Sequence, residues 1–168
     1  MSEFTSDSEI VGATALSENQ YLTFRLADEA YGVDILKVEE IRGWEPVREI
    51  PNTPDFIKGV LNLRGVVVPI IDLRARFGME QVEYHAKTVV IVLSIEAGEE
   101  QHVMGIIADA VSEVLDVDQD SIKKAPNLGA AVNTRYIKGM VMSENMVMLL
   151  DADKLLNPEE FSLIGEIG

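Results

Sequence analysis

The chain contains no cysteine, only two histidines and few aromatic residues, which make up 6% of its 168 positions. The lack of cysteine excludes disulfides, iron–sulfur clusters, thiolate zinc sites and cysteine nucleophiles. Basic residues are also scarce, 14 against 29 acidic ones, and the formal charge is -15. So acidic a chain is a poor candidate for binding nucleic acid or an anionic membrane surface, because both are contacted through basic side chains.

Long apolar runs are absent as well, so we expect no transmembrane helix, and the acidic N-terminal segment lacks the basic start of a secretory signal. We therefore expect a cytoplasmic protein built as one domain or as two small packed units. Residues 1–19 are expected to form a flexible acidic tail. Residues 42–76 depart from the overall charge with six basic and four acidic side chains, which indicates either a contact face or ordinary scatter.

Short apolar or alternating runs rich in valine and isoleucine predict a mostly β protein from residue 20 onward. Turn residues at 27–29 and 143–145 predict two hairpins. Pro69 inside an apolar run predicts an edge position or a bulge, since proline cannot donate a ladder hydrogen bond. Helical elements are expected to be short. Single turns should follow the N-cap residues Asp72 and Asp151, and a C-terminal helix should span residues 157–165.

An internal repeat organises the chain. The motif Phe56-Ile57-Lys58-Gly59-Val60, with a strand ending at Asp72, is echoed by Tyr136-Ile137-Lys138-Gly139-Met140, with a strand ending at Asp151. Upstream, Gly32 and Gly105 each precede similar residues at the same intervals. We expect two homologous units that pack side by side as small five-stranded barrels, at about residues 20–86 and 87–156, with a groove between them.

No constellation of catalytic or metal-binding residues stands out. His85 and His102 lie 17 positions apart, without a carboxylate at ligand spacing. The acidic run at 116–120 resembles the start of a calcium loop, but Ser121 and Asn127 replace the glycine and the glutamate that such a loop needs. We therefore expect no enzymatic activity, no metal and no cofactor.

Two features indicate contact surfaces. Arg64, in Asn62-Leu63-Arg64-Gly65, offers a planar five-donor guanidinium beside a glycine, although a lone exposed arginine is the alternative. Four methionines share one strand face near the C-terminal hairpin, where they either fill the core of the second barrel, the preferred interpretation, or form an adaptable surface. They are Met140, Met142, Met146 and Met148.

From Tyr21 to Leu156 the chain closely resembles the CheW family of chemotaxis coupling proteins. The resemblance rests on a series of motifs in the family's order: residues 31–43, Ile50-Pro51-Asn52-Thr53-Pro54, residues 56–60, Asn62 to Gly65, and residues 68–74. It implies two five-stranded SH3-like barrels side by side. It also implies a non-enzymatic adaptor, monomeric in solution, which is recruited to membrane-associated receptor arrays. Its partners would be the cytoplasmic tip of transmembrane chemoreceptors and the regulatory domain of the histidine kinase CheA, which has a similar fold.

The resemblance also implies the positions of three contact regions. The receptor contact would include Val38, Glu40, Gly59, Arg64 and Val114. The kinase contact would include Ile35, Val38, Ile41, Arg42 and Gly43, and a second array contact would include Lys123 and Leu128.

The residue types fit these roles unequally. Glu40 and Arg64 can make charged contacts, and Gly59 would let a helix or a backbone approach. By the repeat, Val38 is equivalent to Val111, and Val114 to Ile41, so each of them could equally be core.

Two alternatives to the chemotaxis adaptor stay open. One is an enzymatic or small-ligand domain that uses the groove between the barrels, against which the missing catalytic constellation counts. The other is a coupler for motility without flagella. The length of 168 residues indicates a stand-alone coupler, because fusions to a kinase or a receiver are far longer.

Overall fold

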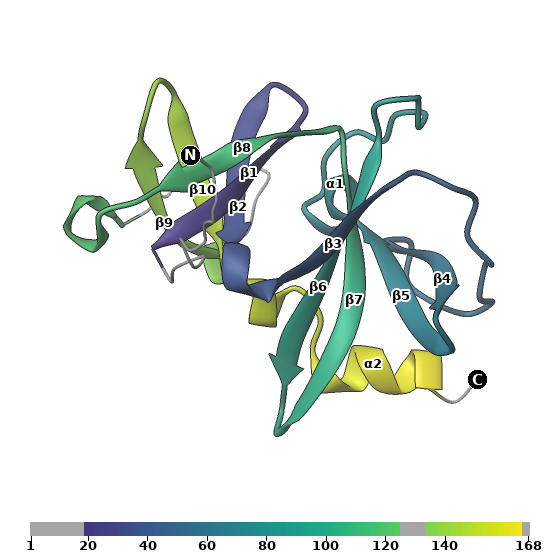
Figure 1. The fold of residues 1–168 in the computed structure, drawn as a ribbon. Helices are drawn as coiled ribbons and strands as arrows, with labels where there is room; N and C mark the ends of the chain where they lie inside the picture. Colours follow the sequence, from purple (N-terminus) through teal and green to yellow (C-terminus); the bar gives the residue numbers. More distant parts are fainter. Residues whose placement is uncertain (1–18, 125–133, 166–168) are drawn as a thin grey trace, which may run out of the picture.

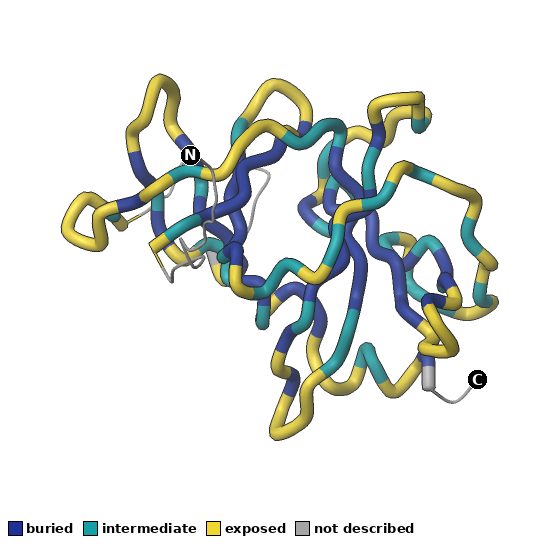
Figure 2. Tube along the Cα trace, viewed as in Figure 1, coloured by how far each residue is buried: buried dark blue, intermediate teal, exposed yellow. Residues whose placement is uncertain are grey.

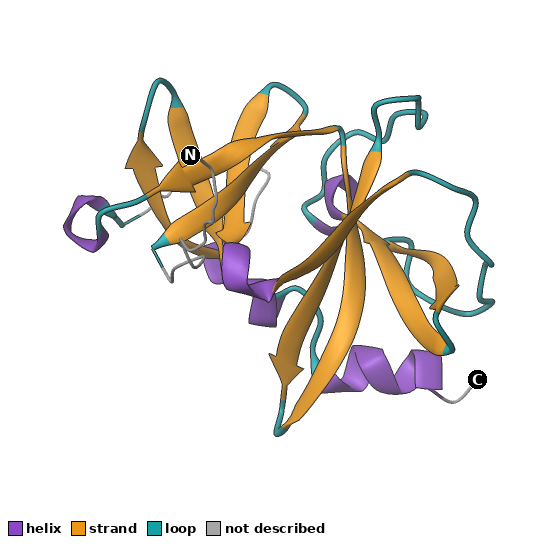
Figure 3. Ribbon diagram, in the orientation of Figure 1, coloured by secondary structure: helices purple, strands orange, loops and turns teal. Residues whose placement is uncertain are grey.

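The computed structural model describes residues 19–124 and 134–165 (Figure 1). The predicted tail therefore falls outside the described residues except for Asn19. The described residues form ten strands in two five-stranded sheets, with short helical elements between them (Figure 3). The predicted all-β class with two five-stranded units is confirmed.

The first sheet has the strand order β8-β1-β2-β10-β9. Its strands are β1 (Gln20–Leu26), β2 (Glu29–Asp34), β8 (Ala110–Asp116), β9 (Ile137–Met142) and β10 (Met146–Leu150). The second sheet has the order β3-β6-β7-β5-β4. Its strands are β3 (Val38–Gly43), β4 (Ile57–Leu63), β5 (Val66–Asp72), β6 (Val89–Ala97) and β7 (Glu100–Ala108).

The two sheets confirm the repeat but not its predicted boundaries. Shifting every strand number by five converts one strand order into the other, as expected for two equivalent units. Each sheet, however, combines the first two strands of one repeat with the last three of the other. The prediction of two contiguous barrels, at 20–86 and 87–156, is therefore wrong. The cause is two short connections, the 3-10 helix Ile35–Lys37 and the single residue Asp109, which carry the chain into the opposite sheet.

Both predicted hairpins are present, since β1 pairs with β2 and β9 pairs with β10 in antiparallel fashion. Pro69 lies in an interior strand rather than at a sheet edge. It is opposite Val60 of β4, but the ladder between β5 and β7 begins only at Ile70. At Pro69, β5 is therefore paired on one side only. This meets the requirement on which the prediction rested, namely that proline cannot donate a ladder hydrogen bond.

The helical elements begin at the predicted capping residues. The Asp72 side chain accepts hydrogen bonds from the first turn of α1 (Leu73–Arg76), and Asp151 caps the 3-10 helix Ala152–Lys154 in the same way. Helix α2 (Pro158–Gly165) follows a capping box. In that box, Asn157 Oδ1 accepts from the Glu160 amide at 2.8 Å, and Glu160 Oε1 accepts from the Asn157 amide at 3.0 Å.

The main core contains side chains from both sheets, so the two sheets form one packed body (Figure 2). Phe24 and Tyr31 of the first sheet belong to the same buried cluster as Ile91 and Ile106 of the second. Two smaller clusters each belong to a single sheet. A shared core fixes the relative position of the sheets, and therefore the position of the residues on their surface.

Candidate functional site

Several of the predicted contact residues gather where edge strand β3 meets the turn between β4 and β5. Arg64 Nη2, from the turn, donates to Glu40 Oε1 of β3 at 3.1 Å. On the same strand, Arg42 Nη1 lies 3.6 Å from Glu40 Oε2, and Arg42 Nη2 lies 3.4 Å from Glu45 Oε2. The Glu40 carboxylate therefore sits between two guanidinium groups. We call Glu40, Arg42 and Arg64 the charged cluster.

The turn presents Arg64 to solvent. Arg64 has a left-handed backbone with φ of 53°, and the Asn62 side chain accepts a hydrogen bond from the Gly65 amide at 2.9 Å. The Arg64 side chain remains 75% exposed despite its ion pair with Glu40, whose side chain is 28% exposed. An exposed ion pair contributes little to stability. Most of the guanidinium is thus free to contact a partner.

The apolar residues predicted for these contacts divide into buried and exposed ones. Ile35 is buried, and Val38 is half-buried against the main core. Ile41 is 45% exposed and Val114 is 44% exposed. The repeat-equivalent positions therefore agree, since Val111 packs on the main core as Val38 does. Only Ile41 and Val114 offer an apolar surface directly.

Gly59 is buried and accommodates the chain's own backbone. A Cβ atom built on it would lie 2.3 Å from the carbonyl oxygen of Arg48, whose backbone pairs with Val60. Its repeat equivalent Gly139 is packed in the same way, beneath the backbone of Lys123. Any influence of Gly59 on a partner must therefore act through the packing of this segment.

The remaining predicted residues lie elsewhere. Val114 is on β8, an edge strand of the first sheet, whereas the charged cluster belongs to the second sheet. Lys123 is exposed and pairs through its backbone with Met140 of β9. Leu128 lies outside the described residues. Gly43 is exposed at the end of β3, beside Arg42.

The preferred interpretation of the methionines as core is wrong for two of them. Met142 is 68% exposed and Met146 is 37% exposed, and these two residues are directly opposite each other in the β9–β10 hairpin. Met140 and Met148, also opposite each other, are half-buried. The buried face of the hairpin carries Val141 instead. Strand parity identified a shared face, but it could not tell which face meets the core.

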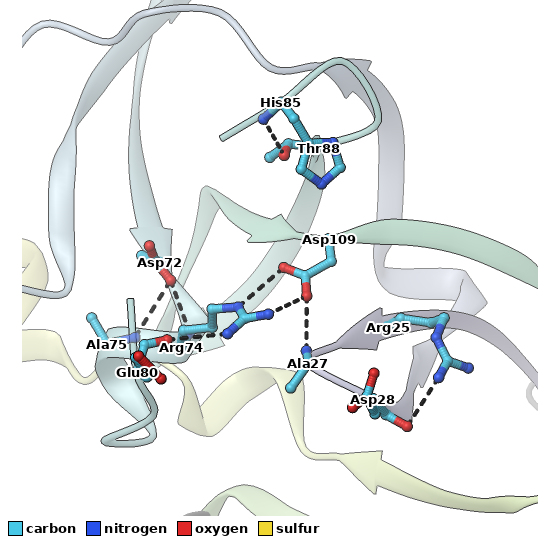
Figure 4. Close-up of polar contacts among 10 residues, drawn as sticks. All are labelled: Arg25, Ala27, Asp28, Asp72, Arg74, Ala75, Glu80, His85, Thr88 and Asp109. Carbon is cyan, nitrogen blue, oxygen red and sulfur yellow. Dashed lines mark hydrogen bonds and ion pairs between the residues drawn. The ribbon is translucent and has the colours of Figure 1, made fainter. Parts of the chain in front are cut away.

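The sequence reasoning missed an ion pair that ties the two sheets together (Figure 4). Asp109, the single residue between β7 and β8, accepts hydrogen bonds from Arg74 Nε at 3.2 Å and Nη2 at 2.5 Å. It also accepts from the Ala27 amide in the β1–β2 turn at 2.8 Å. The hydrogen bond to Asp109 raises the pKa of Arg74. No sequence motif marks this pair, since the partners are 35 residues apart.

The other short connection is also held by an ion pair, but here the connection supplies the cation. Lys37 Nζ, at the end of the 3-10 helix between β2 and β3, lies 3.0 Å from Asp153 Oδ1, in the helical turn after β10. By the repeat, Asp153 is equivalent to Arg74. Both places where the chain changes sheet are therefore fixed by an ion pair.

Two findings on the described residues concern metal ions and membranes. Among residues 19–124 and 134–165, no group of three His, Asp or Glu side chains could hold a metal ion. None of the helices within those ranges is long and apolar enough to cross a membrane. The geometry instead combines exposed charges on β3 and the β4–β5 turn with exposed apolar side chains on two edge strands.

Comparisons with known proteins agree with this picture. The family model of the CheW-like domain matches residues 20–160. The chemotaxis protein CheW of Klebsiella aerogenes is 46% identical over 168 residues, covering 99% of this chain and 98% of the relative. A probable chemotaxis protein CheW of Rhizobium etli is 34% identical over 144 residues, covering 85% and 90% of the two chains. The crystal structure of the scaffolding protein TtCheW from Thermoanaerobacter tengcongensis superposes with a TM-score of 0.74 at 31% identity, covering 86% and 91%.

Proposed function

Because this chain belongs to the CheW-like domain family, we propose that it is a non-enzymatic scaffold of chemotaxis signalling, which couples transmembrane chemoreceptors to the histidine kinase CheA. The relatives' names supply the process and the scaffolding role. The single structural observation that carries the proposal is the charged cluster, with an Arg64 side chain that is 75% exposed on a buried and well-packed framework.

We assign the receptor contact to Glu40 and Arg64 of the charged cluster, together with Val114. A guanidinium paired on one side with a carboxylate is held in place and still presents donors to solvent, as required for a charge-assisted bond to a polar helical tip. Glu40 offers the complementary acceptor. Gly59 is buried against the backbone of Arg48, so its role here is to stabilise the fold and not to touch the receptor.

The kinase contact is assigned to the exposed part of edge strand β3, at Ile41 and Gly43 with Arg42 between them. An edge strand offers unpaired backbone groups as well as side chains, which suits pairing with a similar domain. Lys123 on the first sheet would serve the second array contact. The protein would work in the cytoplasm and reach the membrane only through the receptors.

The test is co-sedimentation of the purified chain with receptor-containing membranes and CheA, with kinase activity recorded. Arg64→Ala should weaken recruitment by about 10–100-fold, because the loss of a charge-assisted hydrogen bond costs roughly 1.5–3 kcal/mol. Circular dichroism should remain native, since the ion pair is exposed. Arg48→Ala is the matched control, because Arg48 is an exposed arginine outside the charged cluster, and this variant should bind as the wild type does.

Two results would count against these assignments separately. Full recruitment of folded Arg64→Ala would remove Arg64 from the receptor contact. A wild-type chain that neither sediments with the receptors nor changes kinase activity would overturn the proposed function itself.

A further inference from the structure

A groove of about 610 Å³ lies where β5, β7 and α2 meet, on a part of the second sheet that the proposed contacts do not use. Its walls are mainly apolar and include Val66, Val67 and Pro69 of β5, Val103 of β7, and Phe161 and Ile164 of α2. Val66 is 52% exposed and Val67 is 48% exposed, although β5 is an interior strand. The groove therefore leaves apolar surface uncovered inside the sheet.

The groove lies beside the part of β5 and β7 where no ladder forms between them. The ladder joins residues 70–72 to residues 105–107 and does not extend toward the start of either strand. In the first sheet, the equivalent strands β10 and β2 pair two positions earlier, from Val147 opposite Ala30. The corresponding positions in the second sheet are Val68 and Val103, which are not paired. The proline at position 69 cannot donate the hydrogen bond that would continue the ladder.

The open ladder leaves a strand edge inside the groove. Residues 100–104 of β7 pair with β6 on one side, and no strand within residues 19–124 and 134–165 pairs with them on the side of β5. In a β-strand, alternate backbone groups point toward each neighbour, so this side presents unpaired donors and acceptors. Apolar walls beside such an edge are the arrangement by which proteins bind an extended peptide as an added strand.

One end of the groove is acidic. Helix α2 begins beside the β6–β7 turn, since a Cβ built on Gly98 would lie 3.4 Å from Pro158 Cγ. Figure 1 shows the start of α2 close to the end of the β6–β7 hairpin. Glu99 and Glu100 of that hairpin and Glu159 of α2 are all exposed. A basic residue of a ligand would complement this end.

We propose that the groove binds an extended, apolar segment of a partner protein, which adds as a strand along β7 and places a basic residue at the acidic end. Met104 is fully buried, so the accessible part of this edge is residues 100–103. It spans about 14 Å at 3.4 Å per residue, so a segment of about four to six residues would fill it. The inference does not rest on the proposed function, because its test contains neither receptor nor kinase.

The probe is a fluorescein-labelled hexapeptide, Lys-Val-Thr-Val-Thr-Val, titrated with the full chain and followed by fluorescence anisotropy. Val67→Glu should bind it at least about 10-fold more weakly than the wild type, because the substitution sets a carboxylate in the apolar wall. Val66→Glu is the second variant, used if Val67→Glu does not fold by circular dichroism. The matched control is Val82→Glu, since Val82 is 46% exposed and does not line the groove.

Hydrogen exchange tests the mode of binding. Amides among residues 101–103 of β7 should exchange more than 10-fold more slowly with the peptide bound. The proposal is overturned if the wild type shows no saturable binding at about 1 mM protein, or if Val67→Glu and Val66→Glu bind as well as the wild type. If a peptide with proline at alternate positions binds equally well, the peptide does not bind as an added strand, and the proposed mode of binding is overturned. Equal binding of a peptide with glutamate in place of lysine would overturn the assigned polarity.

Discussion

The substitution Gly59→Ala tests whether Gly59 acts by packing within the fold or by contact with a partner. The structure allows the expected loss of folding stability to be estimated. A Cβ at this position would lie 2.3 Å from the Arg48 carbonyl oxygen and 2.8 Å from the carbonyl carbon, whereas ordinary contacts begin near 3.4 Å. The obstructing atoms are backbone atoms held in a bridge to Val60, so they cannot swing aside as a flexible side chain would.

Two contributions add to the expected loss of stability. Overpacking in a well-packed region costs about 1–3 kcal/mol. The backbone of Gly59, with φ of 155°, lies in a region that other residues rarely adopt, which adds about 1–3 kcal/mol. The total of roughly 2–6 kcal/mol is a large part of the 5–15 kcal/mol by which domains are usually stable.

The assay is urea unfolding followed by the fluorescence of Trp44, the single tryptophan of the chain, whose ring centroid lies 4.3 Å from that of Tyr84. Gly43→Ala is the matched control, because a Cβ at Gly43 would meet no atom within 4 Å, and its stability should stay within about 0.5 kcal/mol of the wild type. Receptor binding per folded molecule of Gly59→Ala should equal that of the wild type. Unfolding midpoints that coincide for the two variants would refute the packing argument.

Two further predictions concern polar groups that hold the fold. A double-mutant cycle of Arg74→Ala and Asp109→Ala, measured by urea unfolding, should give a coupling energy of about 1–3 kcal/mol, and additive effects would show that the pair does not tie the sheets. Burial and a hydrogen bond to Asp72 raise the pKa of Tyr84 above its usual value of 10.0. The unfolded chain therefore loses this proton first, and stability should fall as the pH rises above about 10. Tyr84→Phe should show a smaller fall between pH 9 and pH 11, and an equal fall would contradict the assignment.

The local elements followed from residue patterns. Alternating apolar runs marked the strands, the turns at 27–29 and 143–145 marked hairpins, and Asp72 and Asp151 marked helical turns, each of which the structure contains. These features depend on neighbours within a few residues, so the sequence carries the necessary information. The repeat was also detectable, because equivalent strands keep equivalent glycines and aspartates.

The candidate site was predicted in part. The resemblance selected Glu40, Arg42 and Arg64, which the structure joins through ion pairs. It did not distinguish the exposed Ile41 and Val114 from partly buried Val38, nor did it reveal that Gly59 packs on Arg48. These distinctions depend on which face of a strand meets the core and on which distant segments pack against it. The alternation of side chains along a strand shows which residues share a face, but it does not show which face is buried or what covers it.

What the sequence determined by itself is a pair of similar five-stranded units with an acidic surface and no cysteine chemistry. What only the tertiary structure decided is which strands share a sheet. The two copies have such similar patterns that a strand of either would fit the same edge. One reason for the observed pairing is that a connection as short as Asp109 cannot return the chain to its own sheet. The other is that ion pairs fix both crossings, Asp109 with Arg74 and Lys37 with Asp153. Pairing is a property of the folded chain, because it depends on contacts between residues far apart in sequence.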